Sequence, residues 1–79
     1  MPAAKGREIR ERRQRLGMKL GELADATGIK YQTLANAESL ARWPLSIEFA
    51  WRIANVLTDK AGEPVVAADL VEMDATTAA

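Results

Sequence analysis

The stretch LGELADATGIKYQTLANAES, residues 20–39, decides the fold of this chain. Its apolar residues recur at helical spacing on both sides of Gly28, which predicts one helix over 19–27 and a second over 31–39. A turn this short makes two helices cross steeply, so the crossing needs a small side chain where the backbones approach, here Ala24. Gly28 is the turn residue that tolerates a positive φ. The outer face of the second helix then projects from the body, where it fits a groove about 12 Å wide.

The same spacing predicts one helix before this pair and one after it. Ile9 and Leu16 share a stripe of a predicted helix over 7–16, which Gly17 ends in a position suited to a left-handed cap. Ser46 is the expected N-cap of the later helix. The apolar stripe of that later helix contains Ile47, Ala50, Trp51, Ala54 and Leu57.

The C-terminal part of the chain carries mixed signals. A Gly-Glu-Pro segment at 62–64 breaks the chain, the valines at 65–66 favour a strand, and the residues behind them favour a helix. We expect a short fifth helix over 65–73. The predicted fold class is therefore all-α, a compact domain of four to five helices.

The domain is expected to cover residues 5–72. Residues 1–4 and 73–79 are small and polar-leaning, with nothing to bury. We therefore expect a flexible N-terminus and a disordered C-terminal tail.

The composition excludes most catalytic chemistry. The chain has 79 residues, enough for one small domain, and contains no Cys and no His. Disulfides, thiolate nucleophiles, the usual zinc sites and the imidazole general base are therefore absent together. No apolar run approaches the roughly 18 residues of a membrane span. We expect a soluble cytoplasmic protein with no catalytic residues, cofactor, metal, small-molecule substrate or membrane partner.

The net charge of zero hides a strong asymmetry along the chain. Residues 1–58 contain ten Lys or Arg and six Asp or Glu, whereas residues 59–79 contain one Lys and five Asp or Glu. The front of the chain is therefore basic and the rear is acidic. This distribution of charge is typical of a protein that binds an anionic partner through one end of the chain only.

Two opposite charges are predicted on inward faces of different helices. Arg13 lies on the stripe of Ile9 and Leu16, and Glu38 follows Leu34 by four residues. Each charge alone would be an unpaired buried ion, so we expect a structural ion pair between Arg13 and Glu38. The alternative is that both side chains reach solvent at the helix ends.

Taken together, these motifs resemble the phage repressor and Cro type of helix-turn-helix protein, the XRE-like group. The likeness covers roughly residues 6–57. It rests on Leu16-Gly17-Met18, Glu22-Leu23-Ala24, Gly28-Ile29, Thr33-Leu34, Glu38, Ile53-Ala54 and Leu57. The resemblance implies a compact five-helix domain that binds double-stranded operator DNA as a homodimer and regulates transcription in a bacterial or phage-infected cell. It also implies a buried ion pair at the positions of Arg13 and Glu38.

The helix over 31–39 carries the residues expected to read DNA bases. Asn and Gln amides donate and accept together, so Gln32 and Asn36 can match the N6 and N7 edge of adenine in the major groove. Tyr31 offers a ring to a thymine methyl group or a hydroxyl to a phosphate, and Thr33 offers either contact more weakly. The plainer interpretation is that these are solvated helix residues.

Four basic residues are placed to contact phosphates, which anchors a protein on DNA without reading its sequence. They are Arg10, Lys19, Lys30 and Arg42. Arg12 and Arg15 of the first helix are interpreted as a solvated face rather than as groove contacts.

Two departures from the family pattern affect this assignment. Leu20 replaces the polar residue, often Gln, that opens the second helix and bonds a phosphate. Leu40 replaces the Gly that commonly follows the recognition helix, so that helix is free to run on and the path to Arg42 stays open.

A single unit of this size offers few base contacts, so tight binding needs two copies. The expected dimer surface is the C-terminal third, where the apolar residues exceed what one small core needs: Phe49, Val56, Val65, Val66, Leu70 and Val71. Trp43 and Trp51 are interpreted as core or core-edge aromatics, with a dimer contact as the alternative. The alternative function is an antitoxin-like or adaptor module of the same fold, whose acidic tail docks a basic partner.

Overall fold

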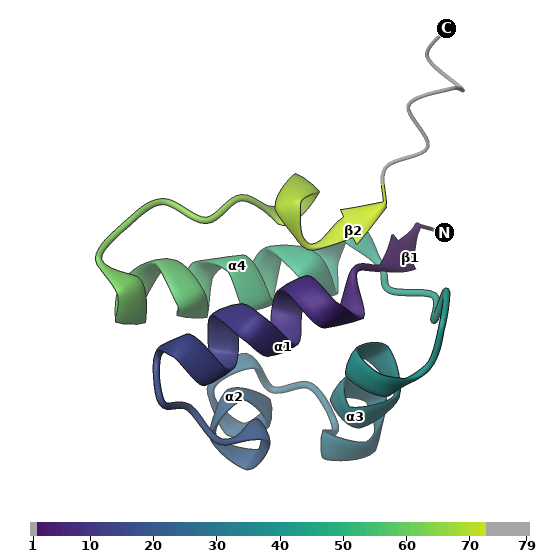
Figure 1. Ribbon diagram of the computed structural model, residues 1–79, viewed down its shortest axis with the longest axis horizontal. Coiled ribbons are helices and arrows are strands. Elements are labelled where there is room, and N and C mark those ends of the chain that lie inside the picture. Colours follow the sequence, from purple (N-terminus) through teal and green to yellow (C-terminus); the bar gives the residue numbers. More distant parts are fainter. Residues whose placement is uncertain (1, 73–79) are drawn as a thin grey trace, which may run out of the picture.

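The computed structural model describes residues 2–72, which form four helices and a two-stranded sheet (Figure 1). In chain order the elements are β1 (Ala3–Ala4), α1 (Gly6–Arg15), α2 (Leu20–Thr27), α3 (Tyr31–Ser39), α4 (Ile47–Ala61), a 3-10 turn (Ala67–Asp69) and β2 (Val71–Glu72). The expected all-α fold class is confirmed.

The helix ends follow from local sequence. Gly28 caps α2 in the left-handed region at φ 73°, and Gly17 and Gly62 adopt φ 71° after α1 and α4. The Ser46 hydroxyl accepts a hydrogen bond from the Phe49 amide at 3.1 Å, which satisfies a free donor in the first turn of α4. The predicted bounds of the first three helices and the predicted start of the fourth therefore agree with the structure to within about one residue.

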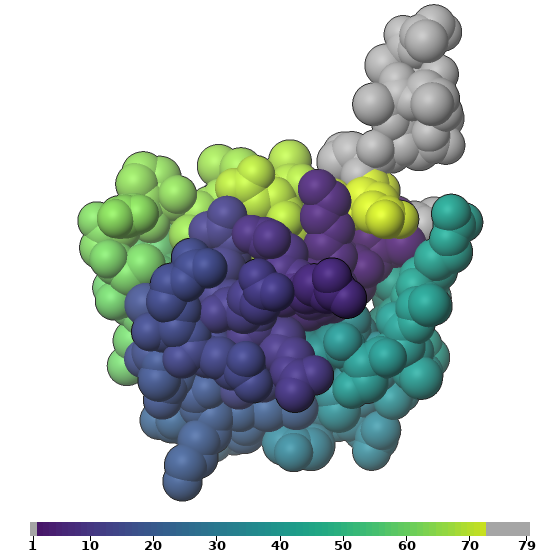
Figure 2. Space-filling model, viewed as in Figure 1, coloured from purple at the N-terminus to yellow at the C-terminus, as the bar shows by residue number. Residues whose placement is uncertain are grey.

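One core lies between all four helices. In Figure 1, α1 crosses the front of α4, while α2 and α3 lie below them, and Figure 2 shows α1 across the middle of the same face with α2 and α3 beneath it. The fully buried large side chains are Ile9, Leu23, Leu34, Leu45, Ile53, Leu57, Leu70 and Val71.

The prediction of a fifth helix over 65–73 is wrong for the part of that segment that the structure describes, residues 65–72. The chain passes through a single 3-10 turn into β2, which pairs antiparallel with β1. Thr58 explains the extended start: its hydroxyl accepts from the Val65 amide at 2.8 Å and donates to the Val65 carbonyl at 3.1 Å. These bonds hold Val65 against α4 in place of helical bonds. Met73, the expected last residue of that helix, lies outside the described residues.

The N-terminal segment differs from the flexible end that was expected. Ala4 is buried, its amide donates to the Trp43 carbonyl at 2.7 Å, and the Lys5 amide donates to the Leu70 carbonyl at 2.8 Å. The small side chains let this strand fit between β2 and the connector before α4. Met1 and the tail over 73–79, for which disorder was expected, lie outside the described residues.

The two tryptophans have different surroundings. Trp43 is half-buried at the edge of the core, as interpreted, but Trp51 is 62% exposed, so its placement in the core is wrong. The cause is the position of Trp51 around the helix. Ala50 and Ala54 mark the side of α4 that faces the core. Trp51 lies about 100° around the helix axis from Ala50 and therefore faces solvent.

The C-terminal apolar residues are mostly core. Val65, Leu70 and Val71 are buried, and Phe49 and Val56 pack partly against the core, whereas Val66 is 54% exposed. The expected dimer surface is therefore wrong for Val65, Leu70 and Val71, because the core recruits the segment that follows α4.

The close approach of α1 to α3 generates a prediction. Gly6→Ala is expected to lower the free energy of unfolding by about 1–3 kcal/mol. A Cβ on Gly6 would stand 2.8 Å from the Glu38 carbonyl oxygen and closer still to that of Ala37. Both are backbone atoms, so relief requires α3 to move. Urea denaturation measures the difference.

The matched control is Gly21→Ala. No heavy atom lies within 4 Å of a Cβ at Gly21, which is inside α2, so this change is expected to raise stability by about 0.4–1 kcal/mol. A Gly6→Ala protein as stable as the wild type would show that α1 and α3 do not touch there.

Candidate nucleic-acid interface

The turn between α2 and α3 is built as the sequence predicts. Ala24 is buried at the crossing, and Leu23 and Leu34 close the wedge behind it. The Thr27 hydroxyl donates to the Leu23 carbonyl at 2.7 Å and accepts from the Ile29 amide at 3.3 Å, which holds the last turn of α2 to the chain that leaves it. The crossing of α2 and α3 is therefore rigidly supported from inside.

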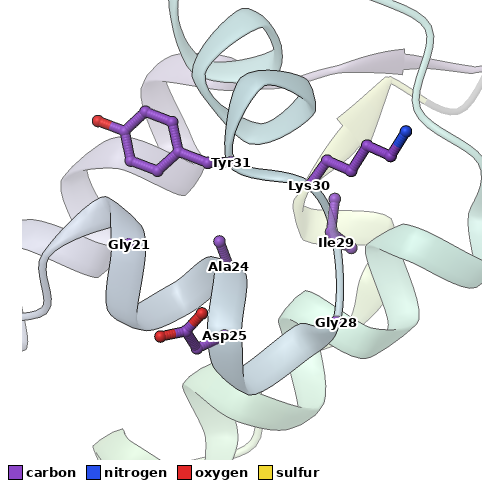
Figure 3. A pocket seen from close by; sticks show the side chains of 7 residues that line it. All are labelled: Gly21, Ala24, Asp25, Gly28, Ile29, Lys30 and Tyr31. Carbon is purple, nitrogen blue, oxygen red and sulfur yellow. The ribbon is translucent and has the colours of Figure 1, made fainter.

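An open hollow of about 440 Å³ lies on the outer side of this turn (Figure 3). Gly21 and Asp25 line it from α2, and the side chains of Lys30 and Tyr31 point to opposite sides of it. Because Gly21 has no side chain, the surface is recessed at the start of α2. The hollow therefore separates the start of α2 from the start of α3 on this surface.

The outward face of α3 carries two amide side chains that bond each other. Gln32 is exposed, Asn36 is half-buried, and the Gln32 Nε2 donates to the Asn36 Oδ1 at 3.0 Å. Residues four apart lie on one face of a helix, so this bond runs along the exposed side of α3. The two residues therefore form one polar strip.

The other two predicted base readers lie on the flanks of α3. Tyr31 is 57% exposed and lies on the side of Glu38, toward α1. Thr33 lies on the opposite flank, where it lines a mainly apolar hollow of about 360 Å³ with Trp43, Pro44, Ser46 and Phe49. The four residues expected to act together are thus a central pair and two flanking side chains.

The four basic residues expected to contact phosphates are all exposed: Arg10, Lys19, Lys30 and Arg42. Lys19 and Lys30 are the residues immediately before α2 and α3. Arg10 lies on α1 between Gly6 and Arg13, which both contact α3 and share its side of that helix. With Arg42 three residues beyond Ser39, basic residues lie in the chain on both sides of α3. None of the four forms an ion pair within residues 2–72.

The structure shows how the chain runs from α3 to Arg42, which the sequence alone left open. α3 ends at Ser39 and does not run on, because Leu40 is extended at ψ 139°. The left-handed residue follows at Arg42, φ 55°, the only described residue other than glycine with a positive φ. The connector thus turns at an exposed arginine.

Arg12 and Arg15 lie on the other side of α1. Arg12 Nε bonds Glu8 Oε1 at 2.8 Å, and its Nη2 lies 3.8 Å from Asp69 Oδ2. Arg15 lines a hollow with Leu57 and Glu63. Neither side chain faces α3, in keeping with the interpretation that they belong to a solvated face.

Arg13 and Glu38 meet in a bidentate contact that joins α1 to α3. Arg13 Nε lies 2.8 Å from Glu38 Oε2 and Nη2 lies 2.9 Å from Oε1, with the side chains only 11% and 5% exposed. Nη1 donates to the Met18 carbonyl at 2.8 Å. Hydrogen bonding to Glu38 raises the pKa of Arg13, against the opposing effect of burial. The arginine remains charged and ties three chain segments together.

Removal of one partner of this pair should be costly. Glu38→Ala is expected to lower the free energy of unfolding by about 3–5 kcal/mol, because Arg13 is left as a buried charge without its counterion. Thermal and urea denaturation measure the loss. Glu8→Ala, which removes a partly exposed pair with Arg12 on one helix, is the control and should cost about 0.3–0.5 kcal/mol. Equal losses in both variants would contradict a structural role for the buried pair.

Comparison with known protein families now identifies this geometry. The family described as Helix-turn-helix matches residues 9–58, more than half of the chain. The chain therefore belongs to the helix-turn-helix family, of the phage repressor and Cro type that its motifs resemble. Neither the curated proteins nor the solved structures that were compared with it gave a match.

Family membership makes the chain a DNA-binding protein of a regulatory rather than an enzymatic family. Every helix within residues 2–72 falls short of the length and hydropathy needed to cross a membrane. The same residues gather no group of three or more His, Cys, Asp or Glu that could hold a metal ion.

Proposed function

We propose that this protein is a sequence-specific transcription regulator that inserts α3 into the major groove of an operator. The observation that carries the proposal is the bonded amide strip of Gln32 and Asn36 on the outward face of α3. Lys19, Lys30 and Arg10 are exposed and form no ion pair within residues 2–72, so their charge is available to DNA. The strip supplies groups that can distinguish base pairs, and the lysines and the arginine supply attraction to the phosphates on either side.

The bond between the two amides bears on how they read a base. With Gln32 donating to its Oδ1, the Asn36 amide is held in one plane and keeps two N–H donors and one lone pair for DNA. Asparagine in such a plane pairs with the N7 acceptor and N6 donor of adenine. Gln32 thus acts as the residue that orients Asn36, and its own carbonyl oxygen is free to accept from a neighbouring base.

The number of base contacts needed to select a site favours two copies that act together. One α3 reaches only a few base edges, which is too little to select a site among the many competing sites of a genome. Two copies on a palindromic operator double the contacts when their recognition helices lie about 34 Å apart, one turn of the duplex. A homodimer bound over a promoter would block transcription.

Salt dependence tests the proposal against the adaptor alternative. The protein should shift random duplex DNA at low salt, and the logarithm of its affinity should fall linearly with the logarithm of the salt concentration. Selection from a random duplex pool should then recover a palindromic site. No shift at low salt would favour the adaptor.

Substitutions separate base reading from phosphate contact. Asn36→Ala is expected to lower affinity for the selected site by about 1–3 kcal/mol and to relax one base position. Lys30→Ala should weaken binding to all sequences and reduce the slope of the salt dependence by about one. Fluorescence anisotropy with selected and scrambled duplexes measures both effects. An Asn36→Ala protein weakened equally on both duplexes would contradict base reading by Asn36.

The role of Gln32 is tested by a double-mutant cycle. If Gln32 orients Asn36, the losses of Gln32→Ala and Asn36→Ala should fall short of additivity in the double variant by about 0.5 kcal/mol or more. The pairing of Gln32 with Lys30 is the control, because Lys30 does not bond the strip, and its effects should add. Strictly additive losses for Gln32 and Asn36 would mean that the two amides act independently.

A further inference from the structure

The outer face of α4 carries the most exposed large apolar side chain among residues 2–72. Trp51 is 62% exposed, and Ile47, one turn earlier on the same flank, is 42% exposed. A different side of α4 packs against the core of the domain, where Ala50, Ala54 and Leu57 are buried. A tryptophan and an isoleucine side by side in water form an apolar surface that is stabilised when another surface covers it.

Charged side chains of both signs border this apolar stripe. Glu48 and Arg52 lie next to it on the solvent side, their side chains 68% and 45% exposed, with Arg52 Nη2 2.7 Å from Glu48 Oε2. The Arg52 guanidinium also lies 5.6 Å above the Phe49 ring, which limits its freedom before any partner arrives. A surface with a central apolar stripe and both charges along its edge can match a rotated copy of itself.

We infer that this α4 face, defined by Ile47, Glu48, Trp51 and Arg52, is the surface through which two copies of the chain pair about a twofold axis; the inference rests on the proposed function. A twofold interface brings the same patch of both copies together. When two α4 helices cross antiparallel near Trp51, the indole rings of the two copies pack on each other. Glu48 of each copy then meets Arg52 of the other.

A second copy fits this face better than the other candidates. The tail over 73–79, Met-Asp-Ala-Thr-Thr-Ala-Ala, contains one large apolar side chain and cannot cover both Ile47 and Trp51. DNA is disfavoured because Glu48 would face phosphates. The charge pattern is neutral and self-complementary, as a contact between identical chains requires.

The dimensions of the protein agree with such a pair on DNA. The described residues span 37 × 26 × 19 Å, so two copies side by side place equivalent points a few tens of ångströms apart. This range includes the roughly 34 Å between successive major grooves on one side of the duplex. α4 starts at Ile47, shortly after α3 ends at Ser39, so an axis near the first half of α4 leaves one α3 on each side of it.

Sedimentation velocity of the full chain over a concentration series tests the inference. The wild type should show a monomer–dimer equilibrium, and Trp51→Glu should raise the dimer dissociation constant about thirtyfold or more, the effect of losing a residue central to an interface. Ala26→Glu adds the same carboxylate to an exposed position of α2 and should leave the constant unchanged. Circular dichroism melting verifies that each variant is folded.

Charge exchange supplies a second, independent readout. Arg52→Glu should weaken the dimer, because two carboxylates then face two more across the axis, and Glu48→Arg combined with Arg52→Glu should restore it. A wild type that stays monomeric, or a Trp51→Glu protein that dimerises like the wild type, would overturn the inference whatever the DNA result. A dimer that depends on Trp51 but selects no DNA sequence would instead overturn the proposed function and leave the interface standing.

Discussion

The bidentate contact between Arg13 and Glu38 is the constraint on which the rest of this structure depends. It ties α1 to α3 inside a small core, and the third donor of Arg13 reaches the Met18 carbonyl before α2. Gly6 lies against the carbonyls of Ala37 and Glu38 two turns earlier on α1, so α3 is held at two points along the same helix. A buried ion pair contributes little net stability compared with apolar packing, but a single broken partner is costly. Its contribution here is to fix the orientation of α3.

That orientation determines what the recognition helix can present. With Leu34 and Ala37 in the core and Glu38 engaged by Arg13, the remaining surface of α3 is narrow, and Gln32 and Asn36 occupy its centre. Tyr31 and Thr33 belong to its two edges. The bond between the amides uses part of their hydrogen-bonding capacity and thereby restricts what remains for DNA. Binding specificity is thus linked to the same contacts that hold the domain together.

The charge asymmetry of the chain also has a structural meaning. Four exposed basic residues that form no ion pair within the described part lie on the helices and connectors next to α3: Arg10, Lys19, Lys30 and Arg42. Arg12 and Arg52, by contrast, pair with acidic neighbours on other faces. A chain of zero net charge can therefore direct a positive surface toward DNA and keep mixed charges elsewhere. The mixed face on α4 is where a second copy is proposed to bind.

Local sequence signals are enough to predict the four helices, the short turn between α2 and α3, and the candidate reading residues. These features depend on signals within one or two turns of chain: apolar periodicity, the Ser46 cap and the left-handed glycines at 17 and 28. The sequence also predicts one contact between distant segments. Arg13 and Glu38 occupy inward positions of two predicted helices, and a buried charge needs a partner of opposite sign.

The packing of the segments over 2–5 and 65–72, and the exposure of Trp51, depend on contacts between distant parts of the chain. The valines at 65–66 favour a strand and the residues behind them favour a helix, so local preference leaves this segment undecided. The hydrogen bonds of Thr58 to Val65 and the pairing of Val71 and Glu72 with β1 make the choice. Trp51 satisfies the helical spacing of α4 as well as its buried neighbours do, and only the positions of α1 and α2 determine which part of that stripe is covered. Contacts between segments far apart in the sequence have no periodic signature, so the sequence alone could not reveal them.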